Sequence, residues 1–160
     1  MQYAISKIEI NKLPLLQFSS AIHVIREDCE VEAALGDVGR NDLLGFDIET
    51  RPAFRKGQRY RPSLLQLAGR DAVYLFQLRR LTDLGPLFSL LEDANLLKAG
   101  VSTRADQAQL QGLHAFEPAG FCDIGHMAKA KGFRNTGLRP LAAPAARAAA
   151  GLPMRRAIHW

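Results

Sequence analysis

Apolar residues recur along this chain with two different periods, one typical of strands and one typical of helices. The clearest strand candidate is LLGFDIET at residues 43–50, where apolar and polar positions alternate over most of the length. Two later apolar runs are separated only by residues 69–71 (GRD), a spacing typical of a hairpin. The three runs within residues 43–78 are therefore expected to form an antiparallel meander. Short apolar runs predict the other strands, at residues 22–26, 63–68, 72–78, 96–101 and 121–122.

Helical spacing of apolar residues occurs before and after that meander. It predicts helices at residues 27–35, 83–92, 104–113, 123–131 and 138–150. Gly36 and Gly39 are expected to end the first helix, and Asp83 is expected to cap the second. Pro144 is expected to kink or shorten the last helix, because proline has no backbone N–H. A meander followed by alternating helices and strands indicates an α/β fold with a mixed sheet flanked by helices.

Length and composition narrow the class of protein without changing this picture. A chain of 160 residues has about the size of one domain, so we expect a single domain spanning residues 1–160. The hydrophobic fraction of 48% and the charged fraction of 23% exclude a disordered, collagenous or coiled-coil chain. The net charge of +5 is a mild bias toward polyanions such as nucleic acid, although charge alone favours a basic protein without such a partner.

Targeting signals, membrane spans and metal motifs are not indicated. Cys29 and Cys122 are too few for a disulfide framework, so we expect reduced thiols and a cytoplasmic location. The scattered histidines and the lack of a CxxC pair argue against a structural zinc site. Charged residues interrupt the N-terminal segment, which excludes a signal peptide, and no run of about 18 uncharged apolar residues predicts a membrane span.

Asp47 and Glu49 are the feature of the sequence most informative about chemistry. Residues i and i+2 of a strand point to the same face, so both carboxylates project together near the C-terminal end of the 43–50 strand. On a buried strand, two adjacent acids repel each other and are costly to desolvate, and a cation such as Mg²⁺ would offset that cost. The alternative is an exposed strand end whose acids meet Arg51 or a nearby lysine. The pair alone does not decide between the two.

A third acid, Asp106, lies in LKAGVSTRADQAQL at the start of the 104–113 helix, directly after a short strand. Strand ends and helix starts converge on one edge of such a sheet, where ligands usually bind. Asp106 is therefore expected to approach Asp47 and Glu49. By itself, Asp106 is explained more simply as a first-turn acid that the helix dipole favours.

The loop RPAFRKGQRYRP at residues 51–62 follows directly on the strand that carries the acids, and it contains no acid itself. Arginines can grip phosphate through two hydrogen bonds, and aromatic rings can stack on unpaired bases. This arrangement is expected for a phosphodiester substrate held over metal ions, and it disfavours the alternative of a merely solvated basic loop. The candidate nucleic-acid-binding residues are Arg51, Phe54, Arg55, Lys56, Arg59, Tyr60 and Arg61.

Taken in order, these segments resemble the DEDD 3′–5′ exonucleases of the RNase D and Werner-exonuclease type. GFDIETRP is similar to the first family motif, and LKAGVSTRADQAQL is similar to the second, with its acid at Asp106. FEPAGFCDIGHMAKAKG, followed by GLRPLAA, is similar to the connecting helices of the family, and ISKIEINKLPLL is like the start of small bacterial members. The resemblance covers essentially the whole chain.

The resemblance implies an RNase H-like fold with a five-stranded mixed sheet, in which an antiparallel meander precedes parallel strands. It implies that Asp47 and Glu49 bind two Mg²⁺ or Mn²⁺ ions and that Asp106 holds a water molecule at a metal. All three acids would thus be both metal ligands and catalytic residues. Nucleotides would be released from the 3′ end of DNA or RNA by a two-metal mechanism.

One departure from the family concerns its third motif, a Tyr or His followed four residues later by Asp on a C-terminal helix. Nothing after Asp123 is acidic here, so we expect one weakened metal site and a domain that lacks its last helix. The expected consequence is weak or absent hydrolysis by this chain. The alternative function is a catalytically weak or inactive nucleic-acid-binding domain with the same fold. Self-association into a homo-oligomer would cover the part of the sheet left open.

Overall fold

The computed structural model describes residues 4–14, 20–52, 54–55, 57–58 and 60–149. The described residues fall into two compact units, one made of residues 20–122 and one made of the described residues on either side of that range. None of the described helices is long and apolar enough to cross a lipid bilayer. The expectation of one domain spanning the chain stays a prediction.

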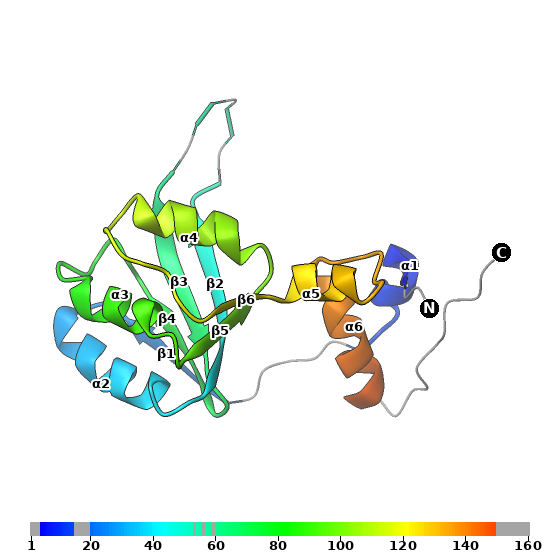
Figure 1. The fold of residues 1–160 in the computed structure, drawn as a ribbon, viewed down its shortest axis with the longest axis horizontal. Coiled ribbons are helices and arrows are strands. Elements are labelled where there is room, and N and C mark those ends of the chain that lie inside the picture. Colours follow the sequence, from blue (N-terminus) through cyan, green and yellow to red (C-terminus); the bar gives the residue numbers. More distant parts are fainter. Residues whose placement is uncertain (1–3, 15–19, 53, 56, 59, 150–160) are drawn as a thin grey trace. The chain divides into compact units, whose positions relative to one another are not determined.

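The unit of residues 20–122 is built on a mixed sheet with strand order β1-β4-β3-β2-β5-β6 (Figure 1). β2, β3 and β4 form the expected antiparallel meander, while β1 pairs parallel with β4 and β5 pairs parallel with β2. The sheet has six strands rather than the five that the family resemblance implies, because β1 is added at one edge. The strand bounds are Ala21–Ile25, Leu43–Thr50, Pro62–Ala68, Ala72–Phe76, Leu97–Gly100 and Phe121–Asp123.

Three helices of this unit bury one face of the sheet. They are α2 (Asp28–Val38), α3 (Gly85–Glu92) and α4 (Thr103–Gln111). Alternation along β2 sends Leu44 and Phe46 into one continuous apolar core with side chains from all three helices. Full burial of each such side chain contributes roughly 1.5–3 kcal/mol of hydrophobic stabilisation. The opposite side chains of β2 consequently point away from the core.

Two helix ends of this unit differ from the sequence expectation. α2 continues through Gly36 to Val38 and ends at Gly39, because Val38 is fully buried and its packing outweighs the low helix propensity of glycine. α3 begins at Gly85 with Leu84 at the N-cap position. The Asp83 carboxylate instead accepts a hydrogen bond from the Gly85 N–H at 2.9 Å.

The second unit contains three helices, α1 (Lys7–Asn11), α5 (Ile124–Ala130) and α6 (Leu138–Ala149). The apolar spacing does not predict α1, which is held by a capping box between Ser6 and Glu9. Asp123 caps α5 by accepting a hydrogen bond from the His126 N–H at 3.0 Å. α6 continues through Pro144, so the helix is not shortened there, and the surrounding alanines have the highest helix propensity of any residue.

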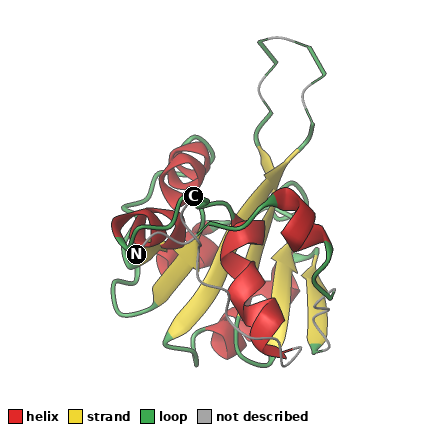
Figure 2. Ribbon diagram, turned by 90° about the vertical axis from the view of Figure 1, so that its right-hand side faces the viewer, coloured by secondary structure: helices red, strands yellow, loops and turns green. Residues whose placement is uncertain are grey.

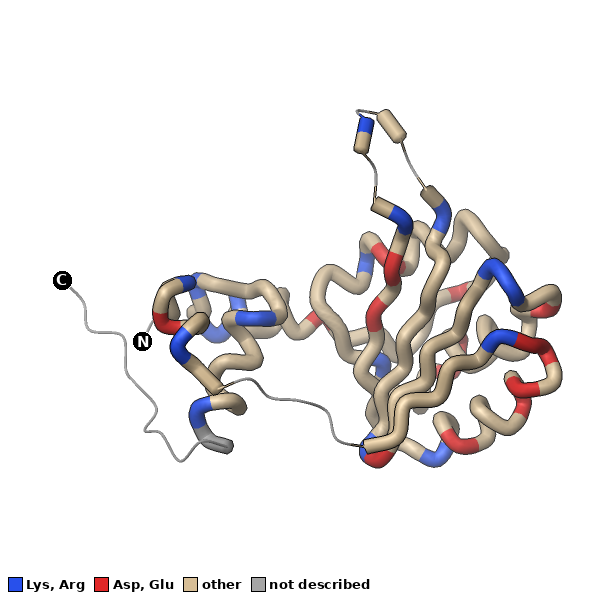
Figure 3. Tube along the Cα trace, turned by 180° about the vertical axis from the view of Figure 1, so that it is seen from behind, with Lys and Arg blue, Asp and Glu red and all other residues tan. Residues whose placement is uncertain are grey.

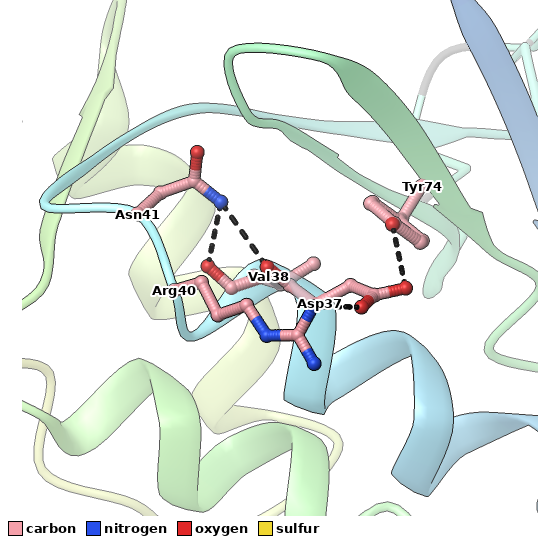
Figure 4. A network of polar contacts seen from close by, with 5 residues as sticks. All are labelled: Asp37, Val38, Arg40, Asn41 and Tyr74. Carbon is pink, nitrogen blue, oxygen red and sulfur yellow. Dashed lines mark hydrogen bonds and ion pairs between the residues drawn. The ribbon is translucent and has the colours of Figure 1, made fainter.

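Asn41, two residues before the start of β2, bonds to the end of α2 (Figure 4) and to the turn between β3 and β4. Its side-chain amide donates hydrogen bonds to the carbonyl oxygens of Asp37 and Val38 at 3.3 and 2.9 Å. Its side-chain oxygen accepts a hydrogen bond from the Arg70 N–H at 3.1 Å. The Tyr74 hydroxyl donates to the Asp37 carboxylate at 3.3 Å. These bonds fix the point at which the chain enters β2.

Lys98 on β5 is fully buried, and backbone carbonyls satisfy its ammonium group. Nζ donates to the carbonyl oxygens of Asp93 at 2.6 Å and Leu90 at 3.5 Å, and it lies 5.3 Å from the centre of the Phe121 ring. Both carbonyls belong to the C-terminal end of α3, where a cation interacts favourably with the helix dipole. Lys98 therefore joins α3 to β5, and its burial lowers its pKa.

Gly100, the last residue of β5, packs closely against the backbone of β2. A Cβ at this position would overlap the Phe46 carbonyl oxygen and lie 2.9 Å from Thr103 Cγ2. Gly100→Ala should therefore lower the free energy of unfolding in urea by about 1–3 kcal/mol. Gly36→Ala is the matched control, because nothing lies within 4 Å of its Cβ and alanine favours a helix over glycine by roughly 0.5–1 kcal/mol. Equal effects of the two substitutions would contradict this packing.

The buried Lys98 should also make stability depend on pH. Because burial holds its pKa below 10.5, the unfolded chain binds more protons than the folded chain between the folded pKa and 10.5. The free energy of unfolding should therefore rise with pH through that window, more steeply in the unmodified chain than in Lys98→Met. Urea unfolding at a series of alkaline pH values measures both slopes. Parallel pH dependences would show that Lys98 is not a buried ammonium group.

Candidate active site

Asp47 and Glu49 project from the face of β2 that is turned away from the core. Both side chains are exposed, while the alternate residues of the strand are buried. The antiparallel register sets Asp47 opposite Gln66 and Glu49 opposite Leu64 on β3. Paired residues of adjacent strands share a face, so the half-buried Gln66 lies on the same face as the two acids, directly opposite Asp47.

The exposure of Asp47 and Glu49 changes the physical reason for expecting a cation beside them, which from the sequence was expected to be the cost of burial. The two acids are in contact with water, so the desolvation cost expected for a buried strand does not arise. Among the described residues, neither Asp47 nor Glu49 forms an ion pair, so Arg51 does not neutralise them. The pair consists of two adjacent exposed negative charges, and their mutual repulsion is what a cation would relieve.

Asp106 lies in the first turn of α4 and is half-buried. α4 contacts β2, and the chain enters this helix through Ser102, whose φ is 62°. In the part of the chain that the structure describes, however, no three His, Cys, Asp or Glu side chains gather closely enough to hold a metal ion. The structure therefore brings α4 to β2 without grouping Asp106 with Asp47 and Glu49 as a three-ligand set.

The donor chemistry on the open face of β2 and β3 fits a hard divalent ion. Carboxylate and amide oxygens are ligands that Mg²⁺ and Mn²⁺ take in proteins, and Asp47, Glu49 and Gln66 supply them from one face. Sequence reasoning does not find Gln66, because its proximity to Asp47 depends on the register between two strands. The only signal in the sequence is that Gln66 interrupts an otherwise apolar strand.

The basic loop between β2 and β3 extends beyond the end of the sheet (Figures 1 and 2). At its tip, the Gln58 N–H donates to the Arg55 carbonyl oxygen at 3.1 Å, which closes a turn. The Gln58 side-chain oxygen accepts a hydrogen bond from the Arg55 N–H at 3.3 Å. Phe54 is 86% exposed, so most of its ring is available for contact with another molecule.

At the base of the loop, the Arg51 guanidinium lies over the Tyr60 ring, 5.4 Å from its centre, a cation–π arrangement. Arg61 on the opposite side of the loop is exposed. Figure 3 shows basic residues in and at the base of this loop, and acidic residues along the adjoining strand. Lys56 and Arg59, also predicted to bind nucleic acid, lie outside the described residues. Positive charge therefore begins where the acid-bearing strand ends.

Comparison with known proteins identifies relatives of this chain. The 3′–5′ exonuclease family matches residues 22–147. The bifunctional 3′-5′ exonuclease/ATP-dependent helicase WRN of Mus musculus is 32% identical in an alignment 109 residues long that covers 62% of this chain and 8% of that protein.

Solved structures of exonucleases share the fold. The Aedes aegypti Nibbler exonuclease domain has a TM-score of 0.63 at 20% identity, over 72% of this chain and 58% of that chain. Trypanosoma brucei RNase D with GMP has a TM-score of 0.63 at 23% identity, over 69% of this chain and 35% of that chain. This chain thus spans less than two thirds of each relative, and the structural likeness confirms the RNase H-like fold. Because the family match covers most of the sequence, the chain belongs to the 3′–5′ exonuclease family.

Proposed function

We propose that this chain hydrolyses phosphodiester bonds from the 3′ end of DNA or RNA, with divalent ions held at Asp47 and Glu49. The observation that carries the proposal is the exposed carboxylate pair on β2, followed directly by a basic loop with an exposed aromatic ring. Membership of the exonuclease family supports the reaction class. Asp106 enters the proposal through its similarity to the second family motif and its position on a helix that contacts β2.

Mg²⁺ or Mn²⁺ is the proposed cofactor, with two ions as the family resemblance implies. The EXD2 exonuclease domain, a structural relative at 23–24% identity, has been solved after soaking in Mg and GMP and after soaking in Mn. When bound, such ions would stabilise negative charge on the phosphodiester and lower the pKa of an attacking water. The carboxylates of Asp47 and Glu49 would hold them on the open face of β2, with Asp106 as the third acid.

A single nucleic-acid strand is the proposed substrate. RNase D of Trypanosoma brucei, a structural relative at 22% identity, has been solved in complex with RNA U12. In this chain, Arg51, Arg55 and Arg61 would attract the phosphates, and the exposed Phe54 ring would stack on an unpaired base. A cytoplasmic location and self-association stay predictions from the sequence.

Replacing one carboxylate tests the catalytic part of the proposal. Asp47→Asn should slow the 3′ shortening of 5′-labelled single-stranded DNA or RNA by roughly 100-fold or more, because it removes a charge that holds the ions. The assay uses Mn²⁺ or Mg²⁺ and enzyme in excess, so that slow cleavage is detected. Asp71→Asn, which changes an exposed acid in the turn between β3 and β4, should leave the rate unchanged.

Two results of this assay would contradict hydrolysis at Asp47. One is a 3′-shortening ladder that Asp47→Asn forms as fast as the unmodified chain. The other is an unmodified chain that binds the oligonucleotide but does not shorten it, which would favour the binding-only alternative.

The ring of Phe54 should contribute to binding independently of cleavage. Phe54→Leu keeps an apolar side chain but removes the aromatic face, so it should weaken single-strand binding by about 1–3 kcal/mol. Fluorescence anisotropy with a labelled oligonucleotide in EDTA measures this affinity without hydrolysis. Phe54→Tyr keeps the ring and should retain the affinity. Equal affinities of the leucine and tyrosine variants would argue against stacking.

A further inference from the structure

A second candidate site lies at the same end of β2 as the two carboxylates, beside apolar side chains of the core. It is a pocket of about 580 Å³ at the base of the basic loop, and its walls include Arg51, Arg61 and Arg79. The sequence-based candidates include the first two arginines, but Arg79 follows β4 and lies outside the basic loop. Its place in this pocket depends on the tertiary fold.

The charged side chains that line this pocket are all positive. Its lining contains three arginines and no acid, and among the described residues none of the three guanidinium groups forms an ion pair. The larger pocket at the other end of the sheet differs, because its lining combines acids with arginines, and Arg40 there pairs with Asp37 at 3.2 Å (Figure 4). Of these two pockets, the one at the base of the loop therefore has an uncompensated preference for anions.

Ser63 on β3 ties together the three segments that supply these arginines. Its hydroxyl donates to the Glu49 carbonyl oxygen at 3.1 Å, two residues before Arg51. Its carbonyl oxygen accepts from the Leu78 N–H at 3.0 Å, one residue before Arg79. Arg61 precedes Ser63 by two residues on the same segment. These bonds hold together the backbone segments from which the three arginines extend, so no large backbone rearrangement is needed to bring the arginines to one ligand.

Three leucines form an apolar part of the pocket wall. Leu78 is buried, and Leu84 and Leu113 are half-buried against the core. Guanidinium groups bind phosphate oxygens through paired hydrogen bonds, and an apolar wall can pack against a sugar or a base. Sulfate or phosphate alone would leave this wall without a partner. The combination suits a nucleotide better than a small inorganic anion.

We propose that this pocket binds the phosphate of a nucleotide, with Arg79 as a ligand that the basic loop does not provide. The proposal rests on the proposed function, because it takes nucleic acid as the substrate. The phosphate belongs either to the strand at a position away from the 3′ end or to a free nucleoside monophosphate.

The test compares Arg79→Gln with Arg80→Gln. Both arginines are exposed neighbours in sequence, and both substitutions remove one positive charge, but Arg80 does not line the pocket. Binding of a labelled single-stranded oligonucleotide is measured by fluorescence anisotropy in EDTA, at several salt concentrations. Arg79→Gln should weaken binding roughly tenfold and reduce the slope of log affinity against log salt by about 0.7, one phosphate contact. Arg80→Gln should change both far less.

Two further measurements in the same binding assay identify the source of the phosphate and the role of the paired hydrogen bonds that a guanidinium group can donate. Arg79→Lys keeps the charge, so it should restore the salt slope but only part of the affinity. Adenosine monophosphate should displace the oligonucleotide in an Arg79-dependent manner if free nucleotides occupy the pocket. If only the strand occupies it, the salt-slope difference remains without such displacement.

Equal affinities and equal salt slopes for Arg79→Gln and Arg80→Gln, together with no Arg79-dependent displacement by adenosine monophosphate, would overturn the pocket proposal. This binding assay contains no metal, so that result would not contradict the separate prediction that Asp47→Asn slows cleavage. An unmodified chain that binds no oligonucleotide at any salt concentration would overturn the pocket and the nucleic-acid substrate together.

Discussion

β2 is hydrogen-bonded along both of its edges, to β3 on one side and to β5 on the other, and the candidate site depends on this double pairing. The side-chain period of a strand is two, so a slip by one residue would turn Asp47 and Glu49 into the core and Phe46 into solvent. Buried Leu44, Phe46 and Ile48 prevent that slip, because their burial against three helices would be lost. The apolar alternation of one strand thus keeps the two acids exposed.

The same strand ends carry two kinds of surface. The open face of the sheet presents carboxylates, and an arginine-lined pocket lies at the same end of β2, with the basic loop extending beyond both. Opposite charges placed this close would neutralise each other if their side chains met. Among the described residues, neither the two acids nor the three arginines form an ion pair, so each set stays available for a ligand of the opposite sign. Under the proposed function, cations would hold the scissile phosphate and the arginines would hold another part of the strand.

Much of the fold could be predicted from the chain because the local signals agree with the tertiary structure. The LLGFDIET alternation gives β2 with its observed bounds, and the three-residue spacing after Ala68 gives the β3–β4 hairpin. The short helix α1 carries its own signal, the Ser6–Glu9 capping box, although apolar spacing misses it. α2 passes Gly36 and ends at Gly39, the second of the two glycines expected to end it, because burial of Val38 overrides the first local helix breaker.

The site could be predicted only as far as it follows from strand alternation. The shared face of Asp47 and Glu49 follows from their i, i+2 spacing, but their exposure does not, because it depends on which face the helices cover. Gln66 and Arg79 come from other segments and enter through register and tertiary packing. The burial of Lys98 could not be predicted either, because nothing in LLKAG distinguishes a buried lysine from a solvated one.

The proposed function requires that the exposed acids of β2 bind divalent ions. A crystal of the chain soaked in Mn²⁺, with anomalous scattering measured at the manganese edge, tests it most directly. The account predicts an anomalous peak in contact with the carboxylates of Asp47 and Glu49, with Asp106 drawn toward it. Peaks confined to other acids, with the pair on β2 left bare at a Mn²⁺ concentration that occupies those other sites, would contradict it.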